Sequence, residues 1–576
     1  VSNHNPKRIY FGTHRVWRSD NRGDSWTPIS KDLTKNEERI TLSIMGKQQS
    51  WDAAWDVYAM STYNTITSLT ESPLDENMLY AGTDDGIIQY TKNGGTTWTK
   101  ILVGNLPNIP STAFVNDIKA DLHDPNTVYV ALDNHKYGDY KPYLLKSTNG
   151  GKTWRSITNG IPENTMVWRI VQDHVNPNLM FLGTEYGIYV SMNQGEKWVK
   201  FSEGLPTISI RDLAIQKREN DLVAASFGRG FYILDDYSPL RNMTESTFLK
   251  PTLFKPRKAL QYKPISGGTS SQGESYFTAK NPDYGAIFTY YLPENFKSIK
   301  SKRQELEKTL KKEDKDIPFP GWDTLDQEKN EEGASIILVV KDSDGNFIKR
   351  IKAPYKKGFN RVSWDLKYAI VSSLNEEGKP SSYPINIFVE EGIYTVSMFS
   401  LINGVVSNLS ESQSFEVKKI RQNVLKNPMS SQIDTYTNNL KAFKLEMDAF
   451  LKKYHETSNM IKGLDNAMAY ITENPSGLEK EISNLKDDLL SLKTNLYGNS
   501  SKKEIGEKEK PTLSDRFSMA KRGYNVSYGP TKMQMESLDI AKELLNRMKP
   551  VLNKLTKDTS KTEEKLIQAG APPILD

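Results

Sequence analysis

Short apolar runs separated by polar turns repeat along the first 240 residues of the chain. Runs of about four to eight residues in which apolar and polar positions alternate predict β-strands. One strand motif, entered from a turn and usually left through Gly-Thr, occurs at Pro6–Thr13, Glu76–Thr83, Pro125–Leu132 and Pro177–Thr184. Further alternating runs precede three of these motifs, at Thr65–Glu71, Val115–Leu122 and Val167–Asp173. Roughly four strands per 40 to 60 residues is the pattern of β-propeller blades.

A turn motif, Ser/Thr-x-Asn-x-Gly-x-x-Trp, follows each strand motif and occurs at Ser19–Trp26, Thr91–Trp98, Ser147–Trp154 and Ser191–Trp198. Its asparagine can bond its own backbone, its glycine supplies a positive φ for a tight hairpin, and its tryptophan starts the next strand. We therefore predict structural roles for Asn21, Gly23, Trp26, Asn93, Gly95, Trp98, Asn149, Gly151, Trp154, Asn193, Gly195 and Trp198. A fifth unit, over Asp212–Asp236, repeats the strands without the turn motif.

Beyond Pro239 the turn motif stops, and the pattern changes twice. Strand-like runs continue over 245–295 and 334–418, and Trp364 with the strand start Gly392-Ile-Tyr-Thr-Val suits an immunoglobulin-like sandwich. The charged segment Lys297–Lys315 interrupts these strands and is expected to be an inserted, solvated helix.

From Ile433 onward, apolar residues step by three and four along three seams, which predicts an antiparallel helical bundle. The expected domains are propeller blades over 1–240, a β-sandwich over 241–425 with a charged helical insertion near 297–330, and the bundle with its tail over 426–576. The fold class is therefore mainly β, with a helical C-terminal part.

Composition excludes several classes of protein. The chain has 576 residues, a net charge of +5 and no cysteine. Without cysteine there is no disulfide framework, zinc ribbon or thiol nucleophile, and six histidines without an HxH or HExxH pair predict no metal site. The charge is too small to indicate a nucleic-acid partner, and no run approaches the roughly 18 apolar residues of a membrane span. We expect no cofactor.

The four turn motifs resemble the Asp boxes of BNR-repeat propellers, the group that contains sialidases, some xyloglucanases and sortilin-like propellers. The stretches Ser226–Asp236, Asn281–Leu292 and Gly358–Leu366 are similar to large bacterial sortilin-like proteins, often labelled glycosyl hydrolases. The resemblance covers nearly the whole chain and implies a secreted, periplasmic or cell-surface protein of Bacteroidetes-type organisms. Two features depart from the family: the box acid is asparagine in all four copies, and the Cys-rich module of animal sortilins is absent.

The strand count predicts an incomplete ring. The first unit has no innermost strand before Pro6, and the last has no outermost strand after Asp236. Three complete and two partial blades are fewer than most propellers use. We therefore expect the rest of the ring to come from sequence upstream of Val1 or from another chain.

Propeller geometry places the loops between the second and third strands on the face opposite the turn motifs. Candidate ligand-binding residues on this face are His14, Arg15, Trp51, Trp55, His135, Tyr137, Tyr186 and Arg229. The carboxylates that could serve a hydrolase are Asp84, Asp85, Asp139 and Glu185. For Asp84, Glu185 and Arg229, the competing interpretation is that they order their turns. For Trp51 and Trp55, it is that they pack the insertion Leu33–Asn64.

Three functions compete. A non-catalytic extracytoplasmic propeller would bind a polypeptide or a glycan. A glycoside hydrolase needs two carboxylates facing each other across its site, at about 5–10 Å. A structural subunit of a cell-surface assembly suits an incomplete ring and a long helical tail. Fold alone does not decide among them, and we favour binding over hydrolysis because the arginine triad of sialidases is not recognisable.

Overall fold

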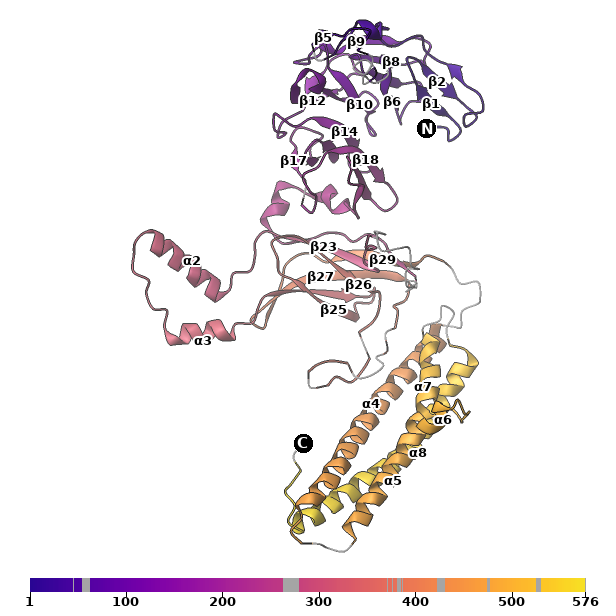
Figure 1. Cartoon of the computed structure of the whole chain (residues 1–576), viewed down its shortest axis with the longest axis vertical. Coiled ribbons are helices and arrows are strands. Elements are labelled where there is room, and N and C mark those ends of the chain that lie inside the picture. Colours follow the sequence, from indigo (N-terminus) through magenta and orange to yellow (C-terminus); the bar gives the residue numbers. More distant parts are fainter. Residues whose placement is uncertain are drawn as a thin grey trace. The chain divides into compact units, whose positions relative to one another are not determined.

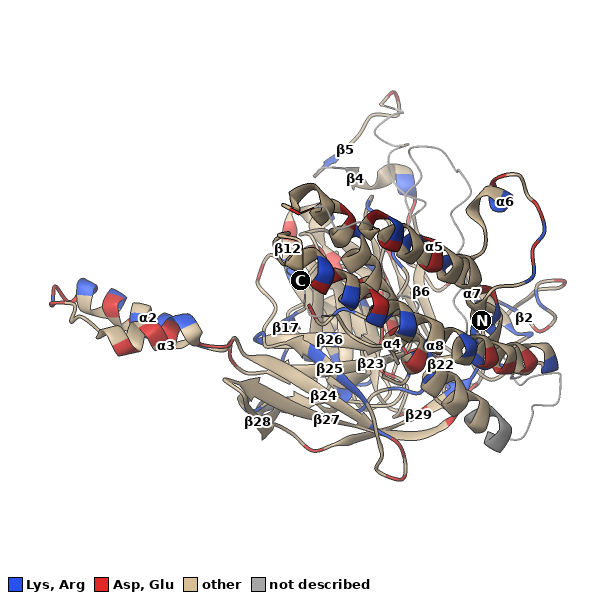
Figure 2. Ribbon diagram, turned by 90° about the horizontal axis from the view of Figure 1, so that it is seen from below, with Lys and Arg blue, Asp and Glu red and all other residues tan. Residues whose placement is uncertain are grey.

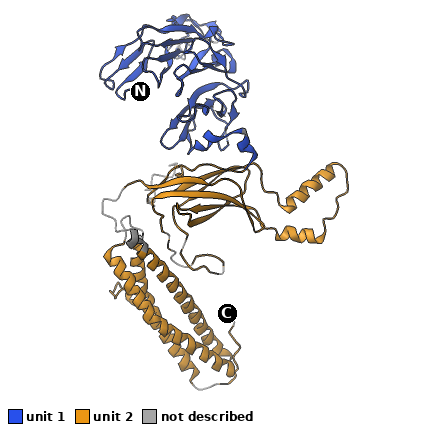
Figure 3. Ribbon diagram, turned by 180° about the vertical axis from the view of Figure 1, so that it is seen from behind, with its two compact units in different colours: residues 1–250 blue, residues 251–576 orange. Residues whose placement is uncertain are grey.

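The computed structural model describes residues 1–44, 46–53, 58, 63–201, 203–262, 279–369, 371–375, 377–380, 385, 387–421, 430–473, 477–524 and 530–574. The chain divides into two compact units, Val1–Lys250 and Pro251–Asp576 (Figure 3). Among the described residues, no helix combines the length and the apolar character needed to cross a membrane.

The described part of unit 1 contains five antiparallel sheets of three or four strands, which follow one another along the chain (Figure 1). Three have four strands: β6 (Ile66–Glu71), β7 (Leu79–Thr83), β8 (Ile87–Thr91) and β9 (Thr99–Leu102); β10 (Phe114–Ala120), β11 (Val128–Asn134), β12 (Asp139–Ser147) and β13 (Arg155–Ser156); β14 (Val167–Gln172), β15 (Met180–Thr184), β16 (Gly187–Ser191) and β17 (Val199–Lys200). Two have three strands: β1 (Ile9–Gly12), β2 (Val16–Ser19) and β3 (Thr27–Pro28); β18 (Ile210–Gln216), β19 (Asp221–Ser226) and β20 (Phe231–Leu234). In every sheet, strands adjacent in sequence are adjacent in space, as in propeller blades.

Smaller elements connect these sheets. A two-stranded ribbon of β4 (Ser43–Ile44) and β5 (Lys47–Gln48) lies in the predicted insertion. Single-turn helices are η1 (Arg39–Thr41), η2 (Val103–Asn105), η3 (His135–Tyr137), η4 (Ser238–Asn242) and η5 (Glu245–Leu249).

Neighbouring blades share their hydrophobic cores. Tyr80 of β7 packs in one core with Val115 and Val130 of the next blade, while Tyr129 of β11 packs with Leu182 of the blade after that. Because blades cover both faces, β7, β11 and β15 are buried along their whole length. The propeller predicted from the repeat is thus supported by the arrangement of the sheets.

Polar contacts also join the innermost strands of successive blades. The Asp117 carboxylate of β10 accepts hydrogen bonds from Ser68 Oγ at 3.3 Å and from Arg169 Nη1 at 3.1 Å. Its second oxygen accepts from the amide of Ile170 at 3.1 Å. Each innermost strand has a bulge at the same place, just before Ser68, Asp117 and Arg169 and again before Asp212 of β18. The bulges aim these side chains at the adjacent blade.

Every turn motif folds into the same hydrogen-bonded hairpin. The hydroxyl of its first residue accepts from the amide of its fifth, as between Gly23 N and Ser19 Oγ at 2.8 Å. The asparagine accepts from the amide of the seventh residue, as between Thr97 N and Asn93 Oδ1 at 2.9 Å. The four fifth-position glycines have φ between +87° and +104°, a region that favours glycine.

In two of the four turn motifs, the tryptophan bonds the preceding blade. Trp98 Nε1 donates to the carbonyl oxygen of Ile29 at 3.0 Å, and Trp198 Nε1 donates to that of Ile157 at 2.8 Å. Trp198 is 2% exposed, whereas Trp26 of the first blade is 40% exposed.

Unit 2 begins with two sheets around one core. A three-stranded sheet contains β21 (Thr252–Leu253), β23 (Ala286–Leu292) and β26 (Gly358–Trp364). A larger sheet contains β22 (Ala259–Gln261), β29 (Gln413–Lys419), β27 (Gly392–Ile402), β24 (Ser335–Lys341) and β25 (Phe347–Pro354), with β28 (Val405–Asn408) paired to β27. Phe288, Trp364 and Phe415 meet in the shared core. The immunoglobulin-like type of this pair of sheets stays a prediction.

The charged insertion forms two helices rather than one, α2 (Ile299–Lys312) and α3 (Trp322–Asn330). Basic and acidic residues are mixed along α2, whereas α3 is mainly acidic (Figure 2). Arg303 of α2 bonds Glu328 of α3 through Nε at 2.6 Å and Nη2 at 2.8 Å. Neither helix buries a described residue, so both are solvated as predicted.

The C-terminal part of unit 2 is helical, as predicted. Its helices are α4 (Ser430–Ala467), α5 (Leu478–Tyr497), α6 (Ser500–Glu504), α7 (Leu513–Lys521) and α8 (Lys532–Gln568), with η6 (Met468–Tyr470) and η7 (Arg522–Tyr524). Leu440, Leu485 and Leu545 are among the residues that bury the predicted seams in one core.

One ion pair is buried inside this helical region. Lys444 and Asp448, one turn apart on α4, bond through Nζ and Oδ1, and their side chains are 1% and 3% exposed. The other Asp448 oxygen accepts from Ser373 N at 3.0 Å and Ser373 Oγ at 3.1 Å. This pair therefore anchors a loop of the sheet region to α4.

Candidate functional site

Carboxylates recur at one position in three consecutive blades of unit 1. Asp84 follows β7, Asp133 lies at the end of β11, and Glu185 follows β15. We call the surface formed by the loops after β1, β7, β11, β15 and β19 the loop face. Sequence analysis did not single out Asp133, although alignment of the strand motifs places it level with Asp84.

Asp84 and Asp85 bond the backbone around the insertion. Asp84 is 5% exposed and accepts from Thr65 N at 2.8 Å. Asp85 is 3% exposed, accepts from Lys35 N at 2.6 Å and bonds the Thr83 hydroxyl. Burial, with a smaller contribution from Asp85, raises the pKa of Asp84 to about 6. These contacts favour the structural interpretation of both residues.

Replacing Asp84 by asparagine should make unit 1 less sensitive to pH. Between about pH 4 and 6 the folded state keeps a proton on Asp84 that the unfolded state releases, so stability falls as pH rises through this window. The free energy of unfolding of Asp84→Asn, taken relative to that of the wild type, should be about 2–3 kcal/mol higher at pH 7 than at pH 4. Urea unfolding of both proteins at the two pH values measures this difference.

Asp139→Asn is the matched control for this prediction. Burial opposes the shift, but hydrogen bonds from Tyr143 and Lys141 lower the pKa of Asp139 overall. The stability of Asp139→Asn relative to the wild type should therefore not be higher at pH 7 than at pH 4. An equal change in stability for Asp84→Asn at both pH values would contradict the assignment.

A second group of side chains, the Trp168 cluster, joins three blades on the loop face. We define it as His135, Trp168, Glu185, Arg211 and Phe227. Trp168 Nε1 donates to Glu185 Oε2 at 2.8 Å, and the Arg211 guanidinium stacks on the Trp168 ring at 3.6 Å. The His135 ring meets the edge of Trp168 at 5.9 Å. Arg211 also lies 5.2 Å from the ring of Phe227, which is 69% exposed.

Hydrogen bonds fix the carboxylates of this region. Glu185 Oε2 also accepts from Ser209 Oγ at 3.0 Å. Asp133 is 1% exposed, and its Oδ1 contacts the His135 imidazole, while its Oδ2 has no hydrogen-bond partner among the described residues. Asp139 accepts from Tyr143 OH at 2.5 Å. In the described part of the chain, the four predicted carboxylates bond amide, hydroxyl and indole groups, and no contact among them shows the facing arrangement of a hydrolase.

The remaining candidates are placed as follows. Tyr137, Tyr186 and Trp51 are 63%, 45% and 80% exposed. Arg15 Nε lies 3.0 Å from His14 Nε2, and both side chains are exposed. Arg229 is exposed, and Trp55 lies outside the described residues. Of the predicted set, His135 and Glu185 belong to the Trp168 cluster, where Trp168 contacts both. Asp84 and Asp85 lie close enough for their charges to interact.

Sequence reasoning missed Trp168 and Arg211 because both occupy the bulges of innermost strands, not loops. The described residues contain no group of three or more His, Asp or Glu side chains suited to a metal ion.

Comparisons with known proteins give structural similarity alone. No family model and no curated protein matches the chain. YCF48 from Cyanidioschyzon merolae is 20% identical, over 30% of this chain and 54% of its own, with a TM-score of 0.23. An ancestral GH74 enzyme is 13% identical, over 70% and 53%, with a TM-score of 0.30. The GH74 xyloglucanase from Xanthomonas campestris is 14% identical, over 50% and 41%, with a TM-score of 0.28.

The chain thus spans about half the length of these three structures, and at such TM-scores they assign it neither ligand nor activity. The class of the chain rests on its own sheets and helices. It is a mainly β protein with propeller blades and a helical C-terminal part.

Proposed function

We propose that unit 1 is a non-catalytic binding module of an extracytoplasmic propeller protein, and that the Trp168 cluster contacts a polypeptide or glycan. One observation carries the proposal: Arg211 is stacked on Trp168 beside the exposed ring of Phe227. Stacking holds the guanidinium flat, with its Nη2 3.8 Å from Glu185 Oε2, so its N–H groups lie in a fixed plane for hydrogen bonds, while an exposed aromatic ring supplies apolar contact.

The hydrogen-bonded turns support a propeller of the BNR type, with asparagine in place of the box acid. Their serine or threonine and asparagine side chains bond the turn itself, so we assign the turn motifs to structure and the opposite loop face to the ligand. A sortilin-like relationship and a secreted or cell-surface location fit this assignment and stay part of the proposal.

Glycoside hydrolysis is the alternative, and the raised pKa of Asp84 favours it. A carboxyl group with a pKa of about 6 is suited to act as a general acid. Against this role, Asp84 is 5% exposed and bonds Thr65 N. Release of reducing ends from a glycan by the full chain, lost in Asp84→Asn, would establish hydrolysis instead of binding.

Ligand binding is tested with variants of the Trp168 cluster. A glycan array and a random-peptide display library are screened with the full chain, and the tightest ligand found is measured by calorimetry. We expect Arg211→Ala and Phe227→Ala each to weaken binding by about tenfold or more, as for hot-spot residues. Arg211→Lys should restore little of the affinity lost in Arg211→Ala, because lysine lacks the planar group that stacks on Trp168.

Arg218→Ala is the matched control, because Arg218 is 81% exposed and pairs only locally with Glu219. It should leave binding unchanged. If the ligand bound Arg211→Ala and Phe227→Ala as tightly as the wild type, the Trp168 cluster would not be the site.

A further inference from the structure

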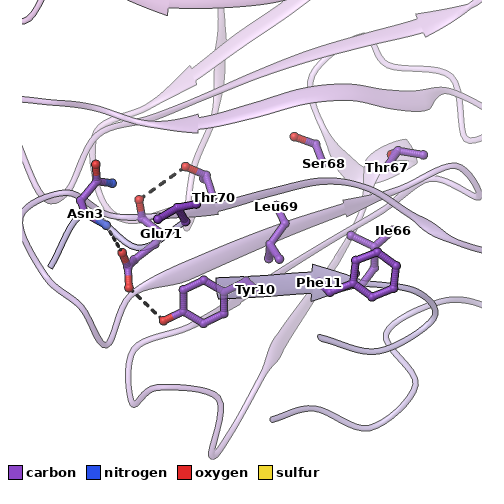
Figure 4. Close-up of a pocket in the computed structure, with 11 residues that line it drawn as sticks. Asn3, Tyr10, Phe11, Ile66, Thr67, Ser68, Leu69, Thr70 and Glu71 are labelled. Carbon is purple, nitrogen blue, oxygen red and sulfur yellow. Dashed lines mark hydrogen bonds between the residues drawn. The ribbon is translucent and has the colours of Figure 1, made fainter. Parts of the chain in front are cut away.

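The carboxylate in one pocket of unit 1 is satisfied within the chain. This pocket, of about 310 Å³, lies between β1 and β6 (Figure 4). Glu71 accepts there from Asn3 N at 2.8 Å and from Tyr10 OH at 2.9 Å. In unit 2, by contrast, charged side chains without such partners gather on two exposed surfaces.

The first surface is the tip of the α2–α3 arm, which we define as Glu313–Asp326 and call the arm tip. Its centre is the apolar segment Ile317–Trp322, which contains two prolines. Phe319 and Trp322 are 62% and 74% exposed, with ring centroids 5.1 Å apart. Neither helix of the arm buries a described residue. The two rings are therefore open to solvent in this chain, as in surfaces that bind a partner.

The arm tip is also acidic. It contains five Asp or Glu and a single Lys, which pairs with Glu313 at 2.8 Å. Asp314, Asp316 and Asp323 are exposed and pair with no described cation. A proline on each side of Phe319 fixes φ there, so the segment loses little conformational freedom when it binds. The arm tip thus places two aromatic rings between unpaired carboxylates.

The second surface is the outer face of the larger sheet in unit 2. Side chains alternate between the two faces of a strand. Ile336, Leu338 and Val340 of β24 lie in the core shared with the smaller sheet. Ile337 and Val339 therefore point to the opposite, outer face.

Strand register identifies the other residues of this face, because directly paired residues share a face. Val339 pairs with Arg350 of β25, and Ile337 pairs with Lys352. Ile337 also pairs with Phe399 of β27. Further along β27, Leu401 pairs with Val406 of β28, which is 55% exposed. We define the outer sheet face as Ile337, Val339, Arg350, Lys352, Phe399, Leu401 and Val406.

One edge of the outer sheet face is basic. The segment Gly345–Trp364, which includes β25, contains six Lys or Arg and no Asp or Glu. Arg350 and Lys352 are exposed, and neither pairs with a described carboxylate. Among the described strands, β25 is the last of its sheet. An apolar surface is thus bordered by unpaired cations, which is complementary to the aromatic and acidic arm tip.

We propose that the arm tip of one copy of the chain binds the outer sheet face of a second copy. The two aromatic rings of the tip cover Phe399, Leu401 and Val406, while its carboxylates pair with Arg350 and Lys352. Because each copy carries both surfaces, a two-fold axis forms both contacts at once and closes a dimer. The contact uses no residue of unit 1, so it is independent of the Trp168 cluster.

Charge reversal tests the pairing, with self-association of the full chain measured by sedimentation velocity. Asp314→Lys with Asp316→Lys should weaken dimerisation at least tenfold, because like charges then meet. Arg350→Glu with Lys352→Glu should weaken it equally. An equimolar mixture of these two variants should associate within about threefold of the wild type, because every arm tip then meets an outer sheet face of opposite charge.

Further variants separate the contact from general effects of charge. Phe319→Ala with Trp322→Ala should weaken dimerisation at least tenfold, as for aromatic anchors of an interface. Asp487→Lys with Asp488→Lys, at exposed positions of α5, is the matched control because it changes the net charge equally. It should alter dimerisation less than twofold. Arg211→Ala, in the Trp168 cluster, should leave it unchanged. Circular dichroism checks that each variant is folded.

Cross-linking shows which copies are joined. Equal amounts of ¹⁵N-labelled and unlabelled chains are mixed and treated with a carbodiimide, which links carboxylates to lysines. We expect linked peptides that join the arm tip of one isotope to Lys352 of the other. Links within one copy only, a wild type that stays monomeric at about 100 µM, or no association in the mixture of charge-reversed variants would each overturn the proposal.

Discussion

Replacing Asp448 with alanine should lower the free energy of unfolding of the helical region by about 3–5 kcal/mol. The Lys444 side chain is 1% exposed and would lose the carboxylate that compensates its buried charge. The variant also leaves Ser373 N without its acceptor. Both effects act in the folded state, where water does not replace the lost partner. Urea unfolding followed by circular dichroism at the helical band measures the change.

The double variant Lys444→Met with Asp448→Leu is the matched control. It removes both charges together and fills the same space with apolar side chains, so we expect most of the stability to return. Each single substitution should then cost far more than the pair. A loss below about 1 kcal/mol for Asp448→Ala would mean that water reaches Lys444 and that the ion pair behaves as a surface pair.

Replacing Asp173 with alanine should cost about 3–5 kcal/mol in unit 1. Asp173 is 0% exposed and accepts from Arg241 Nε and Nη2, both at 2.8 Å, and from Tyr237 OH at 2.6 Å. It holds η4 against the fourth blade through these bonds. Its loss leaves Arg241, whose side chain is 14% exposed, without its carboxylate.

The cost of Asp173→Ala should depend on pH. Burial opposes the shift, but the bonds from Arg241 and Tyr237 outweigh it and lower the pKa of Asp173. Its stabilising effect is therefore complete above about pH 4 and disappears as pH falls through the lower folded pKa. Tryptophan fluorescence during urea unfolding at pH 7 and at pH 3 reports the difference.

Glu196→Ala serves as the control for Asp173→Ala. Glu196 pairs with Arg155, and both side chains are half exposed, so its loss should cost less than about 1 kcal/mol. Equal losses for the two variants would contradict the role assigned to Asp173.

Local chemistry explains why the repeat was predictable. The glycine and asparagine of each turn motif act within eight residues of one another, so their spacing alone specifies the hairpin, as at Asn93 and Gly95. The helical seams are equally local, because residues three and four apart share a face. The charged insertion was predicted as one helix and forms two, α2 and α3, on either side of Pro318 and Pro320.

The candidate site was harder to predict because its members come from three blades. Arg211 and Trp168 are more than 40 residues apart in sequence and meet only when β14 and β18 are adjacent. Each stands inside a strand-like run of apolar and polar residues, and such a run is equally typical of residues that only pack the core. Asp84, Asp85 and Glu185 lie on loops after strands and Asp139 begins β12, and bonds such as the one between Asp85 and Lys35 N depend on how the insertion folds back.

The shared cores have a thermodynamic consequence for ligand binding. Blades packed in series are stabilised by each blade and by each interface between neighbours. The sheet β18–β20 packs against β14 and β15 of the fourth blade, so its local opening breaks that interface. The Trp168 cluster takes residues from the third, fourth and fifth blades. A ligand bound across it therefore stabilises the state in which these three blades are packed together. Occupancy of the loop face would therefore suppress fraying at β18–β20, which couples recognition to resistance against proteases.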